Sequence, residues 1–425
     1  MRKLLQLWLP PTLLIVLLLL PIEARAVASD DWPQFRGPTG QGISTATGIP
    51  TEWNTRKNVA WSVEIPGRGW SSPVISGGKI YLTTSMATPR GPVSLFAICL
   101  DETTGKHLWD TEVFRPNTSL ASQMHGKNSL ASPTPIVTAD RLYVHFGHMG
   151  TAALDLSGKT IWQQTGLKYE PVHGAGGSPA LIGDLLVVDC DGAHDPFIAA
   201  LDATTGAIKW RTPRDTTARK TFSFSTPLPI DVDGQTQIIS PASGFVGSYD
   251  SADGHELWRV RYGEGYSVVP RPVFAHGMVF VSSAFDFPVI YAIRVGGARG
   301  DATDSHVVWT RAKGGPNTPS LLVSGDELYS LSDGGIASCL DVKTGKVHWT
   351  HRLNGTFSAS PILAEGRIYF QSEGGLGIVV KAGKTFEPLA ENDLGERSLA
   401  SPAVVDGALF IRTERHLWKI AASAQ

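Results

Sequence analysis

The chain has 425 residues, a formal net charge of −2, 45 glycines and 28 prolines. No run of basic residues stands out, which argues against a nucleic-acid partner and against an anionic membrane surface as a partner. Sustained helical periodicity is absent after the N-terminus, so the frequent glycines and prolines predict many short strands joined by turns.

Residues 1–26 are typical of a secretory signal peptide. Arg2 and Lys3 precede an apolar stretch from Leu13 to Leu20, and small residues around Ala26 offer a cleavage site. The apolar stretch is short for a membrane span. We therefore expect a periplasmic or secreted mature protein with no stable span after cleavage, and retention as an uncleaved anchor is the alternative. No lipobox cysteine is present near the cleavage site.

An N-terminal arm is expected over residues 27–57. It contains the segment from Asp31 to Gly40, in which Trp32 and Phe35 are the aromatic residues. Aromatic side chains usually pack against apolar surface. We therefore expect the arm to lie against the side of the folded domain, which we assign to residues 58–425.

A phrase with Asp, Thr-Gly and Trp at fixed spacing recurs along that domain. Its first copy is Cys99-Leu-Asp101-Glu-Thr-Thr104-Gly105-Lys-His-Leu-Trp109. The Asp can accept backbone N–H bonds across a turn and the Gly supplies positive φ, so each copy predicts a strand, a tight turn and a second strand. The large indole needs a partner surface, which favours packing between repeats over ligand binding. We assign this structural docking role to Trp61, Trp109, Trp162, Trp210, Trp258, Trp309 and Trp349.

A small or apolar residue followed by Pro marks the start of each repeat. Pro is tolerated at the first residue of a strand, and a Tyr-containing strand follows in several repeats, as at Tyr81. Each unit then has four strands, which is typical of a propeller blade. The predicted fold class is therefore all-β, an eight-bladed β-propeller of four-stranded antiparallel blades. The eight starts are Ser72-Pro73, Ser132-Pro133, Ser178-Pro179, Thr226-Pro227, Val269-Pro270, Thr318-Pro319, Ser360-Pro361 and Ser401-Pro402.

The two ends of the domain are expected to share one blade. The last repeat stops after Trp418 without a fourth strand, while an unassigned strand around Trp61 precedes the first start. We predict that this N-terminal strand completes the last blade and leaves no open sheet edge there. In blade five, an insertion from Arg294 to Val308 replaces the usual turn.

Cys99, Cys190 and Cys339 are the three cysteines of the chain. An odd number forbids complete pairing. Cys99 and Cys339 occupy the same repeat position in blades that are not neighbours. We expect all three to be free and buried.

The repeated phrase resembles the tryptophan-docking repeat of the quinoprotein-type, PQQ-like β-propellers, and the resemblance runs from about Asp31 to Ile420. That family includes alcohol dehydrogenases dependent on pyrroloquinoline quinone (PQQ) and a non-enzymatic propeller of the outer-membrane β-barrel assembly machinery. The resemblance implies the fold. It leaves function open, because the phrase makes blade contacts in catalytic and non-catalytic members alike.

The enzymatic members hold a quinone above the propeller axis, under a vicinal disulfide and beside Ca²⁺ bound by Glu, Asn and Asp. This chain has no adjacent cysteines and no Cys-x-x-Cys-His motif. We therefore expect no catalytic residue, no cofactor and no metal site, and PQQ with Ca²⁺ belongs to the alternative hypothesis. We interpret the oxygen-rich segment from Asp189 to Asp195 as a turn, because the spaced ligands of a calcium loop are missing.

The loops before the Pro-marked strands are expected to emerge on one face and surround the axis. The longest of them, Phe114 to Ala131, is predicted to reach over the central funnel, and long ordered loops are often functional. A solvated polar rim without any ligand is the alternative. The candidate funnel-rim binding residues are Arg68, Trp70, His125, Lys127, Asn128, Tyr266, Arg271, Asn317 and Arg397, and His173, Lys220 and Asn354 lie in the same loops.

The leading functional hypothesis is a non-catalytic, monomeric propeller that acts as a binding or assembly scaffold for a protein or an extracellular polymer. One alternative is a PQQ-dependent, dehydrogenase-like oxidoreductase. A second alternative is a carbohydrate-binding propeller that uses rim aromatics such as Trp70 and Tyr266.

Overall fold

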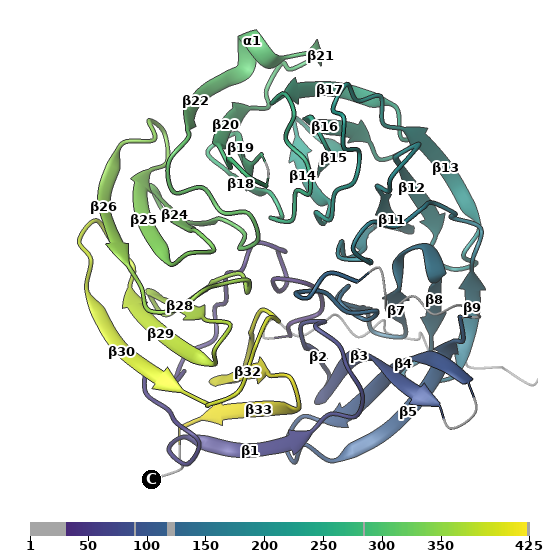
Figure 1. Cartoon of the computed structure of the whole chain (residues 1–425), viewed down its shortest axis with the longest axis vertical. Helices are drawn as coiled ribbons and strands as arrows, with labels where there is room; N and C mark the ends of the chain where they lie inside the picture. Colours follow the sequence, from purple (N-terminus) through teal and green to yellow (C-terminus); the bar gives the residue numbers. More distant parts are fainter. Residues whose placement is uncertain (1–30, 89–90, 117–123, 284, 423–425) are drawn as a thin grey trace, which may run out of the picture.

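The computed structural model describes residues 31–88, 91–116, 124–283 and 285–422. Within these residues, eight sheets stand around a central axis like the blades of a propeller (Figure 1). Each sheet has a core of four antiparallel strands, and the sheet of blade four carries a short fifth strand, so the predicted eight-bladed β-propeller is confirmed. The predicted signal peptide, residues 1–26, lies outside the described residues. No helix in the described part of the chain is long and apolar enough to cross a membrane.

The blades follow the chain in order, and in each the strand nearest the axis comes first. Blades one to four contain β2 (Val74–Ser76), β3 (Lys79–Thr88), β4 (Gly91–Asp101) and β5 (His107–Phe114); β6 (Ile136–Val137), β7 (Leu142–His145), β8 (Thr151–Leu154) and β9 (Thr160–Gln164); β10 (Ala180–Ile182), β11 (Leu185–Cys190), β12 (Phe197–Asp202) and β13 (Ile208–Pro213); and β14 (Leu228–Val232), β15 (Gln235–Pro241), β16 (Phe245–Asp250) and β17 (Glu256–Arg261). A short 3-10 helix, η2 (Gly147–Met149), links β7 to β8.

Blades five to eight repeat this order, except that the last one is completed by the N-terminal strand. They contain β18 (Val273–Ala275), β19 (Met278–Ser282), β20 (Ile290–Arg294) and β22 (Val307–Arg311); β23 (Leu322–Ser324), β24 (Glu327–Leu331), β25 (Ile336–Asp341) and β26 (Val347–Arg352); β27 (Ile362–Ala364), β28 (Arg367–Gln371), β29 (Leu376–Lys381) and β30 (Pro388–Asp393); and β31 (Ala403–Val405), β32 (Ala408–Arg412), β33 (His416–Ala421) and β1 (Val59–Glu64).

The predicted closure of the ring is confirmed. β1 pairs antiparallel with β33, so that Ser62 lies opposite Trp418, and it forms the outer strand of blade eight. The chain ends are thereby joined in one sheet, and no sheet edge is left open between the first and last blades.

Each repeated turn receives a tryptophan from the preceding blade. The ring of Trp162, for example, lies on Gly206, and its Nε1 donates to the carbonyl of Ala203 at 3.0 Å. Gly206 has φ +75°, which favours glycine, and a Cβ there would come within 2.5 Å of the indole. Both the backbone conformation and the close contact therefore require glycine at this position. Trp61, Trp109, Trp210, Trp309 and Trp349 make the same kind of Nε1 hydrogen bond to a carbonyl of the next blade.

Trp258 is the exception to this arrangement. Its Nε1 donates to the side chain of Gln237 in its own blade at 3.1 Å. The cause is the insertion in blade five, which replaces the receiving turn. The insertion instead adds β21 (Gly300–Asp301) as a parallel fifth strand beside β17, followed by α1 (Thr303–His306). Trp258 is nevertheless fully buried in a hydrophobic cluster that includes Val281 of blade five and Ala302 of the insertion, so it still packs between blades, but without a repeated turn to receive it.

The first part of the N-terminal arm, which holds Trp32 and Phe35, does not lie against the side of the propeller as predicted, whereas its last part follows blade seven, where Asn54 bridges to Asp393 of the outer strand β30. The first part crosses the base of the axis, where the chain drawn in purple passes through the middle of the ring (Figure 1). Trp32 bridges to Ile75 in blade one, and Ile43 bridges to Leu363 in blade seven. The arm therefore closes one end of the central channel. The aromatic residues were correctly expected to pack, but the sequence does not say against which face.

The three cysteines are free and buried, as expected. Burial raises the pKa of the Cys99 and Cys339 thiols to about 12, and each of them also lies beside a tyrosine. Both thiols are therefore uncharged at neutral pH and act as small core residues.

Candidate functional site

A ring of side chains surrounds the axis where each blade begins. Seven of its eight members are Ser or Thr, and the backbone N–H of one member donates to the hydroxyl of the next blade's member, as from Ser72 to Thr134 at 3.0 Å. The residue before the first strand has no ladder partner for its N–H, and this hydroxyl satisfies the N–H. We call this set the axial ring: Ser72, Thr134, Ser178, Thr226, Arg271, Ser320, Ser360 and Ser401.

The axial ring corrects three of the predicted blade starts. The structural equivalents of Ser72 are Thr134, Arg271 and Ser320, each two residues after the start that was predicted at Ser132, Val269 or Thr318. At two of these places a second residue-Pro pair follows directly, as Thr134-Pro135 and Arg271-Pro272, whereas Ser320 has no Pro after it, so the local pattern does not identify the true start. Hydrogen bonds between blades decide the register.

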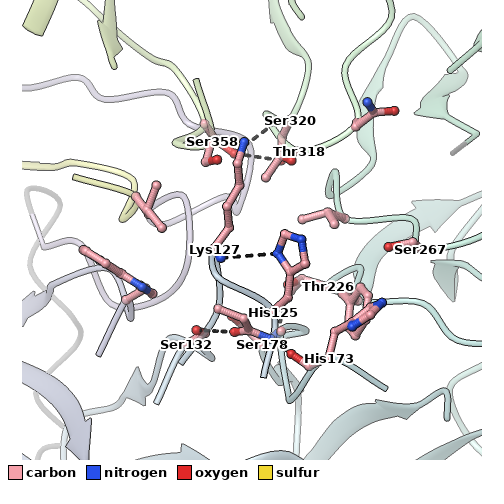
Figure 2. A pocket seen from close by; sticks show the side chains of 18 of the residues that line it. His125, Lys127, Ser132, His173, Ser178, Thr226, Ser267, Thr318, Ser320 and Ser358 are labelled. Carbon is pink, nitrogen blue, oxygen red and sulfur yellow. Dashed lines mark hydrogen bonds between the residues drawn. The ribbon is translucent and has the colours of Figure 1, made fainter. Parts of the chain in front are cut away.

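A cavity of about 440 Å³ lies above the axial ring. Ser and Thr hydroxyls of the ring line it together with Phe35 of the arm, so the arm contributes to the wall at the base. The volume falls in the range of small-molecule and peptide-side-chain pockets. Figure 2 shows this cavity with Ser178, Thr226 and Ser320 around it.

Aromatic side chains form an arc along one side of the mouth of the cavity. The arc runs in the order His125, His173, Phe222, Tyr266 and Phe285. The distances between the centroids of successive rings are 5.5, 5.5, 5.5 and 6.3 Å. Most of these contacts are edge-to-face, which is a favourable geometry for aromatic pairs. The arc draws its members from blades two to five, so it depends on the closed ring.

Positive charge accompanies this arc. The Nζ of Lys220 lies 3.8 Å from the centre of the Tyr266 ring, in cation–π contact. Partial burial, together with the charges of His125 and Lys220, lowers the pKa of His173. His173 is therefore neutral at pH 7, and Lys220 carries the charge on this side of the mouth.

A short strap, residues 124–128, crosses the mouth of the cavity. Lys127 extends across the opening toward Ser358 in Figure 2, and its Nζ lies 2.7 Å from Glu373 Oε1 in blade seven. Ser358 donates to the same oxygen at 2.6 Å. On the other side, Asn128 Nδ2 donates to the carbonyl of His173 at 2.8 Å. The predicted reach of this loop over the funnel therefore agrees with the position of its described residues.

The ion pair between Lys127 and Glu373 is expected to hold the strap in place. Burial alone would raise the pKa of Glu373, but hydrogen bonds from Lys127 and Ser358 bring it below its ordinary value. A carboxyl with a lowered pKa contributes stability above that pKa and loses it as the pH falls through it. We expect Glu373→Gln to speed amide hydrogen exchange in residues 124–128 at pH 7.

The matched control for this prediction is Glu391→Gln in the same blade. Glu391 accepts from Asn354 and does not contact the strap. Mass-spectrometric hydrogen exchange should show faster exchange of the strap in the first variant only. Equal exchange in both variants would mean that the ion pair does not hold the strap.

The carboxylate of the cavity lining, Asp333 in the turn between β24 and β25, is already occupied by the loop that precedes β23. Asp333 accepts from the backbone N–H groups of Asn317 and Thr318 at 2.7 and 3.2 Å and from the Thr318 hydroxyl at 2.6 Å. Among the described residues, no three His, Cys, Asp or Glu side chains are placed to hold a metal ion. Calcium requires several oxygen ligands. The donor set of this funnel therefore does not fit a quinone–calcium centre.

Six of the nine predicted rim residues line the cavity, namely Trp70, His125, Lys127, Asn128, Tyr266 and Asn317. Arg397 lies outside the lining, with its guanidinium 5.6 Å from the ring of Trp70. Arg68 is exposed beyond the cavity and bridges to Ser85. The expectation for Arg271 was wrong, because it belongs to the axial ring and its side chain is buried at the base. A binding role for the other eight remains a prediction.

Several lining residues were not among the predicted site residues. Phe222, Phe224 and Phe285 line the cavity from loops that do not repeat, and Phe35 reaches it from the arm. The ring hydroxyls had a signal in the sequence, since a Ser or Thr precedes most of the first strands. That signal was interpreted as a strand start only.

The segment from Asp189 to Asp195 is more than a turn. Asp189 and Asp191 are buried and bind the same guanidinium, with Arg214 Nη2 and Nη1 at 2.6 and 2.5 Å. Ser240 donates to the second oxygen of Asp189 at 2.7 Å. The acidic cluster therefore forms a buried ion pair at the end of blade three, and its hydrogen bond with Ser240 joins it to blade four.

The chain is similar in sequence to an outer membrane protein assembly factor. A family model described as outer membrane protein assembly factor BamB matches residues 50–168, 194–324 and 294–417. The outer membrane protein assembly factor BamB of Yersinia pestis is 23% identical over 356 residues, which cover 81% of this chain and 76% of the relative.

Two solved structures show the same fold at 12% identity. BamB from Moraxella catarrhalis superposes with a TM-score of 0.61 and covers 86% of this chain and 98% of its own. The quinohemoprotein alcohol dehydrogenase ADHIIG from Pseudomonas putida HK5 superposes with a TM-score of 0.63 over 93% of this chain and 81% of its own. Because the family model matches most of the propeller, the chain belongs to the PQQ-like β-propeller family described as outer membrane protein assembly factor BamB.

Proposed function

We propose that the protein is a non-catalytic scaffold of the bacterial envelope that docks a partner protein at the mouth of its central funnel. Membership of the BamB family supports an assembly role, since the matched relative is named as an assembly factor for outer membrane proteins. The same relationship supports a periplasmic location, close to the outer membrane. A cleaved signal peptide at residues 1–26 is part of this proposal.

The observation that carries the docking site is the exposed aromatic surface at the mouth. Phe287 is 88% exposed and Phe285 is 44% exposed, and both lie in the loop between β19 and β20. Tyr266 holds this loop by donating from its hydroxyl to Asp286 at 2.8 Å. Large aromatics exposed at the rim of a concavity are typical of interaction sites and often supply the dominant binding contacts. The neighbouring Lys220 favours an acidic segment on the partner.

A redox role has less support. The quinone alternative needs free oxygen ligands beside the axis, whereas Asp333 is occupied by Thr318 of the loop before β23 and Glu373 is paired with Lys127. We expect purified protein to show no saturable change in tryptophan fluorescence with pyrroloquinoline quinone and Ca²⁺. We also expect no reduction of an electron-accepting dye with alcohols or sugars. Stoichiometric quinone binding would contradict the non-catalytic assignment.

A carbohydrate-binding role also has less support. Sugar rings stack on open aromatic faces, but Trp70 is only 6% exposed and Arg397 lies over its ring. One face of Tyr266 is occupied by Lys220. Trp70 is therefore buried and Tyr266 has one face covered, so the two aromatics on which this alternative depends offer little open ring surface.

A further inference from the structure

Two arginines meet at the base of the axis, next to Phe35, whose carbonyl accepts a hydrogen bond from Arg271. Arg36 comes from the arm and Arg271 from the axial ring, and both side chains are almost completely buried, with 1% of each residue exposed. They are close enough for the charge of Arg271 to lower the pKa of Arg36. Burial lowers the pKa of each to about 9, so both guanidinium groups are charged at neutral pH.

The partners of these two groups are backbone carbonyls. Arg36 Nη2 donates to the carbonyl of Leu321 at 2.7 Å. Arg271 Nη1 donates to the carbonyl of Phe35 at 2.8 Å, and its Nη2 donates to that of Pro227 at 2.9 Å. Neither guanidinium forms an ion pair with a carboxylate within the described residues. The site therefore buries two like charges without a counter-charge.

Part of their hydrogen-bonding capacity is also unused. Nε and Nη1 of Arg36 and Nε of Arg271 are buried and have no hydrogen-bond partner. Burying an uncompensated charge is costly, and buried donors are normally paired. Two such groups side by side, with three unpaired nitrogen atoms, form the donor set of an anion site.

We propose that a small inorganic anion of about the size of chloride binds between Arg36 and Arg271 and ties the arm to the base of the propeller. The close packing of the arm favours a small ion, since a Cβ on Gly40 would meet the Arg271 guanidinium at 2.3 Å, and one on Gly42 would meet that of Arg36 at 2.7 Å. The bound anion would offset the positive charge of the two guanidinium groups and accept hydrogen bonds from their unpaired N–H groups. This site is separate from the docking surface at the mouth.

Thermal unfolding of the purified full-length protein at constant ionic strength tests the proposal, with chloride replacing gluconate. A ligand that binds only the folded state raises the unfolding temperature with its concentration. We expect a saturable rise with chloride and slower hydrogen exchange in residues 36–42. Phosphate is the comparison arm, and an equal rise with phosphate would overturn the proposed size of the ion. Equal stability in chloride and gluconate would overturn the site.

Two variants locate the response. Arg36→Met should remove the dependence on chloride while relieving the repulsion with Arg271. Arg412→Met is the control, because Arg412 is equally buried but its Nη1 has three oxygen acceptors in Ser71 and Thr83, and its response to chloride should persist. If Arg36→Met does not fold, anomalous diffraction from crystals of the unaltered protein in bromide decides. A peak between the two guanidinium groups is expected, and its absence would reject the site.

Discussion

Replacing Trp162 with alanine is expected to lower the free energy of unfolding by about 3–5 kcal/mol, as for other large buried aromatics. The indole lies against the turn of blade three, and its Nε1 donates to the Ala203 carbonyl at 3.0 Å. The substitution leaves a cavity between two blades and an unpaired carbonyl. Equilibrium denaturation by urea, followed by circular dichroism, measures the loss.

A substitution at Gly206, on which the Trp162 ring packs, tests the same contact from the other side. Gly206→Ala combines a positive φ of 75° with a contact of 2.5 Å to the Trp162 ring. We expect the free energy of unfolding to fall by about 2–5 kcal/mol. The left-handed backbone contributes about 1–2 kcal/mol of this loss and overpacking contributes about 1–3 kcal/mol. Gly183→Ala is the matched control, since Gly183 has φ +54° and no neighbour within 4 Å. Equal losses in the two variants would show that the indole contact contributes nothing.

Replacing Arg214 with methionine is expected to cost about 3–5 kcal/mol at neutral pH, the usual effect of removing one partner of a buried ion pair. Its guanidinium binds Asp189 and Asp191, and all three side chains are almost fully buried. The substitution leaves two adjacent carboxylates without their cation. Unfolding free energies from chemical denaturation of both proteins measure the difference.

The pH dependence of this variant has a definite sign. Burial raises the pKa of Asp189 and Asp191 even with Arg214 in place. Without the cation, both pKa values rise further. A carboxyl whose folded pKa is raised favours folding at low pH, and this stability is lost as the pH rises through the folded pKa. The deficit of the variant should therefore shrink from pH 8 toward pH 5.

An exposed ion pair is the control for this experiment. Arg115 pairs with Glu112 at 2.6 Å, but its side chain is 60% exposed. Exposed pairs contribute about 0–1 kcal/mol, so Arg115→Met should be nearly neutral at every pH. A similar loss in both variants would contradict the special role of the buried cluster.

The sequence predicted the elements whose cause is local and repeated. Asp, Gly and Trp at fixed spacing specify the turns and the blade contacts, and the surplus Trp61 predicted the closing strand. The hydrogen-bond partner of an indole could not be predicted where it depends on distant residues. Trp258 turns to Gln237 because an insertion in another blade removed its acceptor. The phrase around Trp258 keeps the Asp, Gly and Trp of the other copies, although Asp253 stands where they have Thr or Ser.

The funnel was predictable only in part for the same reason. The loop that contains Lys127 was recognised by its length, and its ion pair with Glu373 joins residues 246 positions apart. Arg271 is a charged residue next to a loop, as expected of a residue at the rim, but its place in the axial ring follows from hydrogen bonds between blades. Phe35 reaches the cavity because the arm crosses the base, and no local pattern encodes that path. Phe285 and Phe287 lie in a loop that no other blade repeats.

Site-specific photo-crosslinking is the most direct test of docking at the funnel mouth. A photoreactive amino acid replaces Phe287 in the full-length chain in living cells, and Lys106 is the control. Lys106 lies on the opposite face, in the turn where Glu102 N donates to Gly78 at the far end of β2. We expect a discrete crosslink to an envelope protein from position 287 and none from position 106. A crosslink from position 106 alone, or none from either position, would contradict docking at the funnel mouth.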